Sequence, residues 1–218
     1  DEAAASDARA ILITGTGEKA FCAGADISEF MGRNVVECIA ATELGQNTFA
    51  KLDSLSIPSL AVINGFALGG GLELATACTL RVATANAKLG VPEIKLGLIP
   101  GYGGTQRLPR LVGQGRALDM VMTGRMVAAE EALSMGLINR LVEAPAIDGA
   151  IAYAREFAGF SLPVLRYGRE AVMRADQSAL AEGLLIERDL NTLAFQGEDA
   201  IEGATAFLEK RAPDFKDR

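Results

Sequence analysis

Histidine and tryptophan are absent from this chain and cysteine is rare: the 218 residues include no His, no Trp and only three Cys. A chain without imidazole has no Ser-His-Asp or Cys-His nucleophile, and most zinc and haem sites are excluded with it. The cysteines are Cys22, Cys38 and Cys78, odd in number and widely spaced. We expect them to be buried, reduced thiols that form neither a disulfide framework nor a metal-binding pair. Any catalysis must then use carboxylates, lysine, tyrosine, thiols or the backbone.

Long apolar runs and long runs of like charge are also missing. No stretch approaches the roughly 20 apolar residues that cross a bilayer, and residues 1–7 carry no basic segment. The 28 acidic and 21 basic residues give a net charge of −7 without any charged block, which argues against nucleic acid as a ligand. We therefore expect a soluble intracellular protein with neither a membrane nor a nucleic-acid partner. The expected location is the cytoplasm, or the mitochondrial matrix if the source is eukaryotic.

The apolar pattern predicts short buried strands alternating with helices over the first two thirds of the chain. The predicted strands are 10–14, 59–63, 80–84, 88–91, 125–127 and 138–142, and the predicted helices are 35–55, 71–78, 105–111, 117–123 and 128–135. From residue 148 onward every periodic segment is helical, over 151–158, 164–175, 180–195 and 199–210. This pattern predicts an α/β protein, with a core over 1–145 and a helical region over 146–218.

The segment from Asn64 to Ala75 is the most informative, because three consecutive glycines lead directly into a predicted helix. Glycines without Cβ atoms let a ligand approach the backbone, and the first N–H groups of a helix lack partners within it. These groups and the helix dipole favour negative charge. Glu73 lies in the first turn of that helix. The segment therefore predicts a site that holds a developing oxyanion.

A second carboxylate, Glu93, follows Pro92 between Gly90 and Gly97. Each acid taken alone has an ordinary structural explanation. Glu73 complements the helix dipole, and Glu93 is equally consistent with an exposed loop acid. The combination of two acids with a glycine cradle favours acid–base chemistry instead.

Gly15, Gly17 and Ala20 partly match a dinucleotide-binding fingerprint after a predicted strand. A helix should begin within such a motif, but Gly24 interrupts helical continuity soon afterwards. We interpret these glycines as a turn from a strand into a loop.

Four blocks of sequence together resemble the enoyl-CoA hydratase (crotonase) family, and the resemblance runs from about Ala10 to the C-terminus. The blocks are Ala20–Ile27, Asn64–Ala75, Pro92–Gly97 and Ile99–Leu108, the last reading Ile-Pro-Gly-Tyr-Gly-Gly-Thr-Gln-Arg-Leu. The resemblance implies a crotonase-like spiral of ββα units, followed by C-terminal helices that assemble trimers, often paired into hexamers.

The resemblance also implies roles for individual residues. In the family, two backbone N–H groups hold the thioester carbonyl, and these map onto Ala25 and Gly70. The glutamates map onto Glu73, which would orient and deprotonate water, and Glu93, which would give a proton to carbon. Further contacts with the acyl-CoA or the reacting water are implied for Ala23, Asp26, Ile27, Ser28 and Gly101. No metal or redox cofactor is expected, since coenzyme A is part of the substrate.

The predicted function is therefore that of an enoyl-CoA hydratase, a lyase that adds water reversibly and syn to a trans-2-enoyl-CoA, as in fatty-acid β-oxidation. An enoyl-CoA isomerase or a pathway-specific acyl-CoA dehydratase with the same glutamates is the alternative within the family. A non-enzymatic scaffold or RNA-binding relative is the alternative outside it, and the acidic charge and intact acid pair speak against it. The expected assembly is a homotrimer or a dimer of trimers.

Two features depart from the family pattern. The family commonly has Cys-Asp-Ile after the catalytic helix, whereas this chain has Cys78-Thr79-Leu80 and so lacks a supporting carboxylate there. The chain also begins some tens of residues into the family fold, and the preceding part would hold the opening strands and a segment that contacts coenzyme A.

Overall fold

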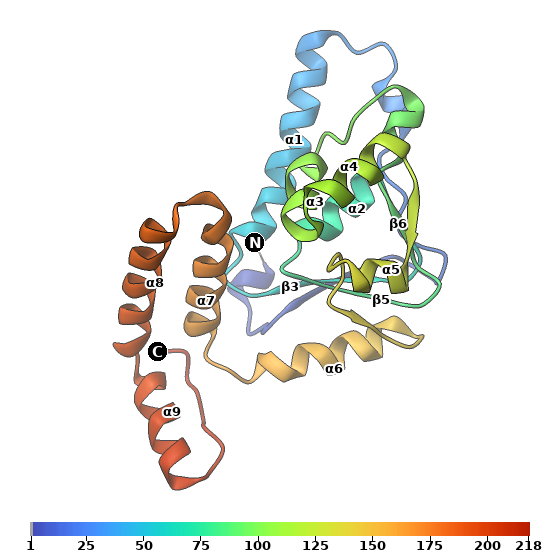
Figure 1. The fold of residues 1–218 in the computed structure, drawn as a ribbon. Coiled ribbons are helices and arrows are strands. Elements are labelled where there is room, and N and C mark those ends of the chain that lie inside the picture. Colours follow the sequence, from blue (N-terminus) through green and yellow to red (C-terminus); the bar gives the residue numbers. More distant parts are fainter. Residues whose placement is uncertain (1) are drawn as a thin grey trace. The chain divides into compact units, whose positions relative to one another are not determined.

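The computed structural model describes residues 2–218, and the contacts among them form two compact units (Figure 1). The sheet unit comprises residues 11–55 and 59–153 and contains every strand. The helical unit comprises residues 2–10, 56–58 and 154–218. The change of unit falls inside one helix, between Tyr153 and Ala154, rather than at residues 145 and 146.

Two four-stranded sheets form the sheet unit, and the chain alternates between them. One sheet has the order β1 (Ile11–Thr14), β3 (Ser59–Ile63), β5 (Leu80–Ala83) and β8 (Arg140–Leu141), all parallel. The other has the order β2 (Ala20–Cys22), β4 (Phe66–Leu68), β6 (Lys88–Gly90) and β7 (Met126–Ala128), with only β7 antiparallel. Because α1 (Val35–Asp53) follows β2 and α2 (Gly70–Ala77) follows β4, each turn of the chain is a ββα unit.

The central strand β3 is buried over its whole length, as expected for a parallel strand covered on both faces. Successive side chains of a strand point to opposite faces. Ala61 and Ile63 accordingly belong to the core cluster that contains Leu72 of α2. Leu60 and Val62 belong to a second cluster with Ala146 and Ala150, in the first half of α6 (Ala146–Ala158). Packing of β3 against Leu72 therefore fixes the position of α2, the helix that begins with the glycine run.

The remaining elements of the sheet unit are short. They are η2 (Ile27–Phe30), η3 (Pro92–Leu96), α3 (Gly104–Val112), α4 (Gln114–Thr123) and α5 (Ala129–Ser134). The helical unit holds η1 (Ala3–Ala5), α7 (Leu162–Arg174), η4 (Ala175–Gln177), α8 (Leu180–Phe195) and α9 (Glu198–Glu209), while α6 (Ala146–Ala158) spans both units. Within residues 2–218, no helix combines the length and apolar character needed to cross a bilayer.

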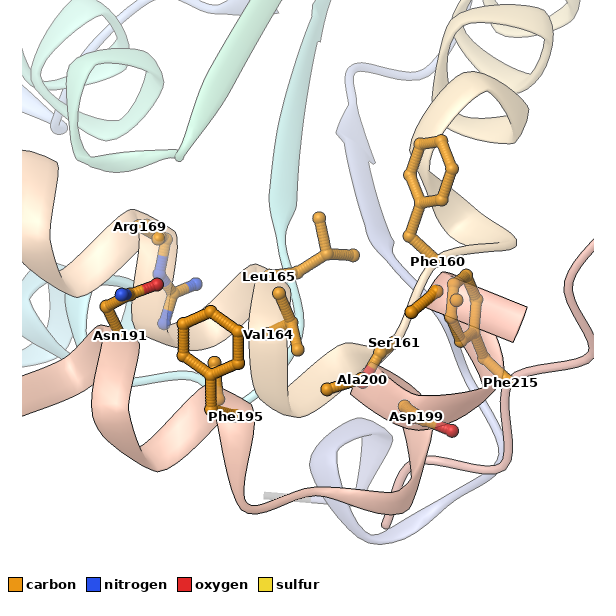
Figure 2. Close-up of a pocket in the computed structure, with 14 residues that line it drawn as sticks. Phe160, Ser161, Val164, Leu165, Arg169, Asn191, Phe195, Asp199, Ala200 and Phe215 are labelled. Carbon is orange, nitrogen blue, oxygen red and sulfur yellow. The ribbon is translucent and has the colours of Figure 1, made fainter. Parts of the chain in front are cut away.

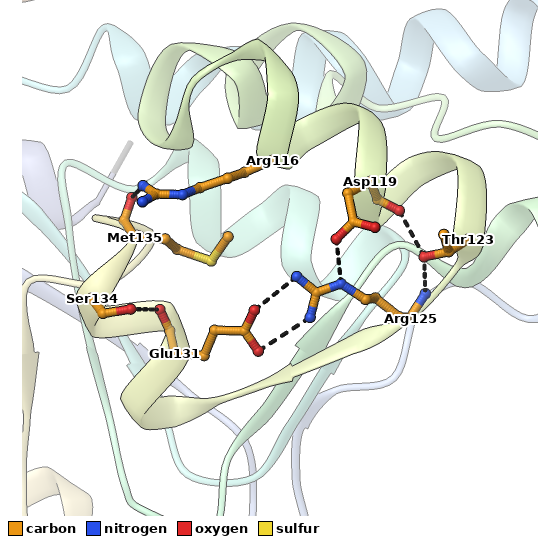
Figure 3. A network of polar contacts seen from close by, with 7 residues as sticks. All are labelled: Arg116, Asp119, Thr123, Arg125, Glu131, Ser134 and Met135. Carbon is orange, nitrogen blue, oxygen red and sulfur yellow. Dashed lines mark hydrogen bonds and ion pairs between the residues drawn. The ribbon is translucent and has the colours of Figure 1, made fainter.

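A polar network at the surface joins α4 to α5 (Figure 3). The Arg125 guanidinium donates to both carboxylate oxygens of Glu131, at 2.7 and 3.1 Å, and to Asp119. These hydrogen bonds from Arg125 lower the pKa of Glu131. The network therefore ties Arg125, the residue before β7, to both α4 and α5.

The predicted elements agree with the structure where the apolar runs are long. The predicted strand 59–63 is β3 itself, and the predicted C-terminal helices correspond to α6, α7, α8 and α9. The strands β2 and β4 were not predicted, because each has only three residues, too few to show an alternation of apolar and polar side chains. No helix is predicted for the segment after Pro92, but it forms the short helix η3. The turn interpretation of Gly15 and Gly17 is confirmed, because a strand rather than a helix follows.

The prediction that all three cysteines are buried was wrong. Cys78 is buried and burial raises its pKa to about 11, but Cys22 is only half-buried and Cys38 is exposed. Cys38 lies on α1, which has no buried residue along its 19 positions. The apolar period that predicts this helix does not mark a buried face, because Val35, Val36 and Ile39 are all more than half exposed.

The glycine run yields a prediction about stability. A Cβ on Gly71 would lie 1.9 Å from the backbone oxygen of Cys22, whereas a Cβ on the helical Gly115 would have no atom within 4 Å. We expect Gly71→Ala to lower the free energy of unfolding by about 1–3 kcal/mol, since β2 must move to admit the methyl group. Gly115→Ala should be neutral or stabilising by up to about 1 kcal/mol. Urea unfolding of both variants measures the difference, and equal stability would contradict the close packing of α2 on β2.

Candidate active site

A cavity of about 370 Å³ lies in the sheet unit, beside the N-terminus of α2. Its wall comes from four parts of the chain that are distant in sequence: the segment after β2, α1, the start of α2, and residues 92–102. The residues that line it are Ala23, Gly24, Ala25, Ile27, Arg33, Cys38, Ala41, Thr42, Gly69, Gly70, Glu73, Pro92, Glu93, Leu96, Leu98, Ile99, Gly101 and Tyr102.

The backbones of Ala25 and Gly70 meet at this cavity. A Cβ on Gly70 would lie 3.7 Å from the Ala25 nitrogen, and a Cβ on Gly24 would lie 3.7 Å from the Gly70 nitrogen. Gly70 is the first residue of α2, so its N–H has no acceptor within the helix. Among the described residues, neither N–H donates a hydrogen bond. Two neighbouring donors therefore face one space, with the positive end of the helix dipole behind one of them.

Gly69 has to be glycine for two reasons. Its φ of 55° and ψ of −127° lie in a region that side chains disfavour. A Cβ there would also lie 3.0 Å from Oε1 of Glu93. The Gly69 N–H donates to the Gly90 oxygen at 2.9 Å, which attaches the start of α2 to the end of β6. The glycine run thus brings the N-terminus of α2 close to the second carboxylate.

Glu73 is 2% exposed and its carboxylate is held by the backbone of a turn. Its Oε1 accepts hydrogen bonds from the N–H groups of Tyr102 and Gly104, each at 2.7 Å. Burial raises the pKa of Glu73, while these two donors and the nearby charge of Arg107 act in the opposite direction. The carboxylate is therefore oriented by fixed donors and is more basic than an exposed glutamate.

Glu93 is held differently, in the short helix η3. Its Oε2 is buried and has no hydrogen-bond partner among the described residues. Burial and, to a smaller extent, the negative charge of Glu73 together raise the pKa of Glu93 to about 6. A carboxyl group with this pKa remains protonated in about one molecule in ten at pH 7, far more often than an exposed glutamate, so it can act as a proton donor. The mutual effect of the two acids means that they titrate as a pair.

The turn that holds Glu73 is fastened to α1. Gly103 has a φ of 112°, and the Arg107 side chain donates to the Tyr102 oxygen at 3.3 Å. Arg107 also pairs with Asp53 of α1 at 2.6 Å. Gln46 of α1 donates to the Gly101 oxygen at 2.8 Å. Three polar contacts therefore fix the turn between α1 and α3.

Most residues predicted from the sequence lie at this cavity. Glu73, Glu93, Ala25 and Gly70 line it together, as do Ala23, Ile27 and Gly101. Asp26 and Ser28 do not line it. Asp26 instead caps η2, where its side chain accepts from the Ser28 backbone at 2.9 Å and from the Ser28 hydroxyl at 2.7 Å. These bonds lower the pKa of Asp26.

The sequence reasoning missed the parts of the site that hold the acids. The N–H groups of Tyr102 and Gly104 were not identified as donors to Glu73, nor was Arg107 identified as a nearby charge. The glycine-rich turn itself was the available signal. A segment with glycines at 101, 103 and 104 exposes its backbone N–H groups readily.

Thr79 occupies the position at which the family commonly has an acid. Its hydroxyl accepts from the Ser59 backbone at 3.2 Å and lies 3.3 Å from the Ser59 hydroxyl. The Thr79 N–H donates in turn to the Ser59 hydroxyl at 3.0 Å. This side chain therefore attaches the start of β3 to the end of α2 and does not belong to the cavity wall.

A second cavity, of about 610 Å³, lies within the helical unit (Figure 2). Its wall is mainly apolar, with the rings of Phe160, Phe195 and Phe215 around it. None of the residues predicted as functional lines this cavity. Asp199, its buried carboxylate, accepts from the backbone N–H groups of Lys216 and Asp217, so its charge is already satisfied. Across residues 2–218, no group of three or more His, Cys, Asp or Glu side chains is placed to hold a metal ion.

Comparison with known proteins finds relatives that are similar in sequence and in fold. A family model described as enoyl-CoA hydratase/isomerase matches residues 2–218. A probable enoyl-CoA hydratase of Mycobacterium bovis is 46% identical over 97% of this chain and 82% of that protein. A crotonyl-CoA hydratase of Syntrophomonas wolfei is 41% identical over 94% of this chain and 79% of that protein. The crystal structure of an enoyl-CoA hydratase from Bacillus anthracis has a TM-score of 0.91 and 41% identity, over 96% of this chain and 82% of that one.

These similarities also confirm the predicted fold class, an α/β crotonase-like spiral of ββα units followed by helices. The family model and the relatives cover nearly the whole chain, so the assignment does not depend on one short motif. On the sequence match, the fold and the paired carboxylates together, the chain belongs to the enoyl-CoA hydratase/isomerase family.

Proposed function

We propose that this protein is an enoyl-CoA hydratase that adds water reversibly and syn to a trans-2-enoyl-CoA, giving the 3-hydroxyacyl-CoA. The observation that carries the proposal is the meeting of Glu73 and Glu93 at one cavity, beside two backbone N–H groups without acceptors. Hydratase names on relatives at 46% and 41% identity support the same reaction.

The backbone donors stabilise the charge that develops during the reaction. Attack of water on the β-carbon moves electrons onto the thioester oxygen and forms an enolate. The N–H groups of Ala25 and Gly70 are placed to donate to that oxygen, and one such donor contributes roughly 3–4 kcal/mol of transition-state stabilisation. Because these donors are backbone groups between packed elements, they need little reorganisation when the charge appears.

The carboxylates move the protons. Glu73, ionised and held by two fixed donors, accepts a proton from the attacking water, while Gly101 helps to position that water. Glu93, protonated, gives its proton to the α-carbon of the enolate. Dehydration uses the same groups in the opposite protonation states. The addition is syn because both carboxylates act from one face of the double bond.

The substrate, location and assembly complete the proposal. The acyl-CoA brings its own activating thioester, so the reaction needs no resident metal or redox cofactor. We expect a cytoplasmic enzyme that forms a homotrimer or a dimer of trimers. The helical unit supports assembly, because many of its large apolar side chains are exposed. They are Leu180, Leu184, Leu185, Leu193, Phe195, Ile201, Phe207 and Leu208. A surface of this kind is typical of a contact between subunits.

Removing either acid should abolish most of the activity. We expect Glu73→Gln and Glu93→Gln each to lower kcat for crotonyl-CoA hydration by about 10²–10⁴, since one proton transfer is lost in each. Glu130→Gln, the same change at an exposed acid on α5, is the matched control and should keep full activity. Loss of the enoyl-thioester absorbance gives the rate. Full activity in both site variants would contradict the proposed roles.

A label in the solvent separates hydration from isomerisation. Product formed in ¹⁸O-water should carry one labelled oxygen at the β-carbon, because hydration takes that oxygen from water. An isomerase acting on a trans-3-enoyl-CoA would shift the double bond and incorporate no label. Mass spectrometry of the product therefore decides between the two family activities.

The raised pKa of Glu93 yields a prediction about stability. The ordinary pKa of 4.5 is raised to about 6 in the folded chain, so the ionised form costs stability above pH 6 and that cost vanishes below pH 4.5. A shift of this size would amount to about 2 kcal/mol without screening, and we expect about 1 kcal/mol beside an open cavity. Glu93→Gln should therefore be more stable than the wild type near pH 8 and not near pH 4.5. Urea unfolding at one protein concentration measures this, and a difference independent of pH would contradict it.

The assembly is tested by mass in solution. Light scattering on the purified protein should give three or six times the 22.8 kDa of one chain. Replacing Leu184 with Glu, in the exposed apolar surface of α8, should lower the assembly state at a fixed concentration. A wild type that is folded, active and monomeric would overturn this part of the proposal.

A further inference from the structure

The ring of Tyr102 lies between α1 and the N-terminus of α2. A Cβ placed on Gly45 of α1 would lie 2.3 and 2.4 Å from Cδ1 and Cε1 of this ring. A Cβ on Gly70 would lie 3.4 and 3.5 Å from Cδ2 and Cε2, the atoms of the opposite edge. The ring therefore acts as a spacer, with one edge against the α1 backbone and the other against a predicted oxyanion donor.

The same ring closes the cavity on this side. Tyr102 lines the cavity, whereas Gly45 and Phe49, which contact the ring from behind, do not. Phe49 meets the ring edge-on, with 5.8 Å between centroids and 88° between planes. Space freed by loss of the ring would be bounded by these two half-buried residues, so the cavity would extend toward an apolar region.

One face of α1 forms both the cavity wall and the seat of the ring. Its residues recur at helical spacing along the helix: Cys38, Thr42, Gly45, Phe49 and Asp53. The first two line the cavity, the next two contact the ring, and the last pairs with Arg107. The distance of α1 from α2, and with it the width of the cavity, therefore depends on the size of the side chain at position 102.

We propose that the Tyr102 ring determines which acyl chains this enzyme accepts, by closing the cavity between Gly45 and Gly70 and so favouring short 2-enoyl-CoA substrates. This inference rests on the proposed hydratase function. In the proposed reaction the thioester oxygen accepts from the Gly70 N–H and the reacting carbons are bound near Glu73, so the acyl tail would continue into the part of the cavity that Tyr102 lines. The Tyr102 hydroxyl forms no hydrogen bond among the described residues, so it is the ring, and not the hydroxyl, that closes the cavity.

The test is the chain-length profile of four proteins. The kcat/KM for trans-2-octenoyl-CoA and that for trans-2-dodecenoyl-CoA are each divided by the kcat/KM for crotonyl-CoA. These two ratios of long-chain to short-chain activity are measured for the wild type, Tyr102→Phe, Tyr102→Ala and Gly45→Ala. Tyr102→Ala should raise the ratio by about tenfold or more, since each methylene accommodated in an apolar pocket is worth a factor of this order. Tyr102→Phe, which keeps the ring, should leave the ratio within about twofold.

The variants at Gly45 act from the other side of the ring. Gly45→Ala should push the ring into the cavity and lower the ratio. The double variant Gly45→Ala with Tyr102→Ala should lose this effect, because the new methyl group then occupies the space that the ring leaves. If Tyr102→Ala does not fold, Tyr102→Leu takes its place and should raise the ratio in the same direction.

The outcomes distinguish the inference from the function on which it rests. A uniform change across all three substrates would show that the ring only supports the fold, and would overturn the inference. A folded wild type that hydrates none of the three would overturn the proposed function instead.

Discussion

The burial of the Glu73 carboxylate against two backbone N–H groups is the constraint on which the rest of the site depends. A buried carboxylate without donors would be costly, and the turn at residues 102–104 supplies them at 2.7 Å. That turn needs glycine at 103 for its φ of 112°, and at 104 because a Cβ there would lie 3.0 Å from Oε1 of Glu73. Arg107 and Gln46 then fix the turn to its neighbours. The contacts around the site thus serve to keep one charged group inside the protein.

The two carboxylates differ in their partners as well as in their burial, since Glu73 is buried and Glu93 half-buried. Glu73 has two donors on one oxygen, whereas the buried Oε2 of Glu93 has none among the described residues. Donors favour the charged form and their absence favours the neutral form. Burial raises the pKa of both acids, but only Glu73 has two backbone donors that act against this rise. The surroundings of Glu73 thus suit a group that accepts a proton, and those of Glu93 suit a group that gives one.

The sequence could predict the elements and the acids, but not how the acids are held. The apolar run of β3 and the glycines before α2 determine the conformation of their own segments, so the strand and the helix start could be predicted from a few consecutive residues. The bonds from Tyr102 and Gly104 to Glu73 span 29 and 31 residues and depend on the conformation of a turn. The position of the Tyr102 ring depends on Gly45, more than 50 residues away. Such contacts follow from tertiary packing, which no local pattern encodes.

The helix α1 has no buried residue, although it forms one wall of the cavity. Leu52, near the end of the helix, packs against the core cluster, and Gln46 and Asp53 contact the turn and Arg107. By contrast, β3 and α2 are buried over most of their length. Local opening of a protein follows the regions with least burial. Movement of the N-terminal half of α1 would therefore disturb little of the core, and it would offer a bulky thioester a route in and its hydrated product a route out while the sheets and Glu73 stay in place.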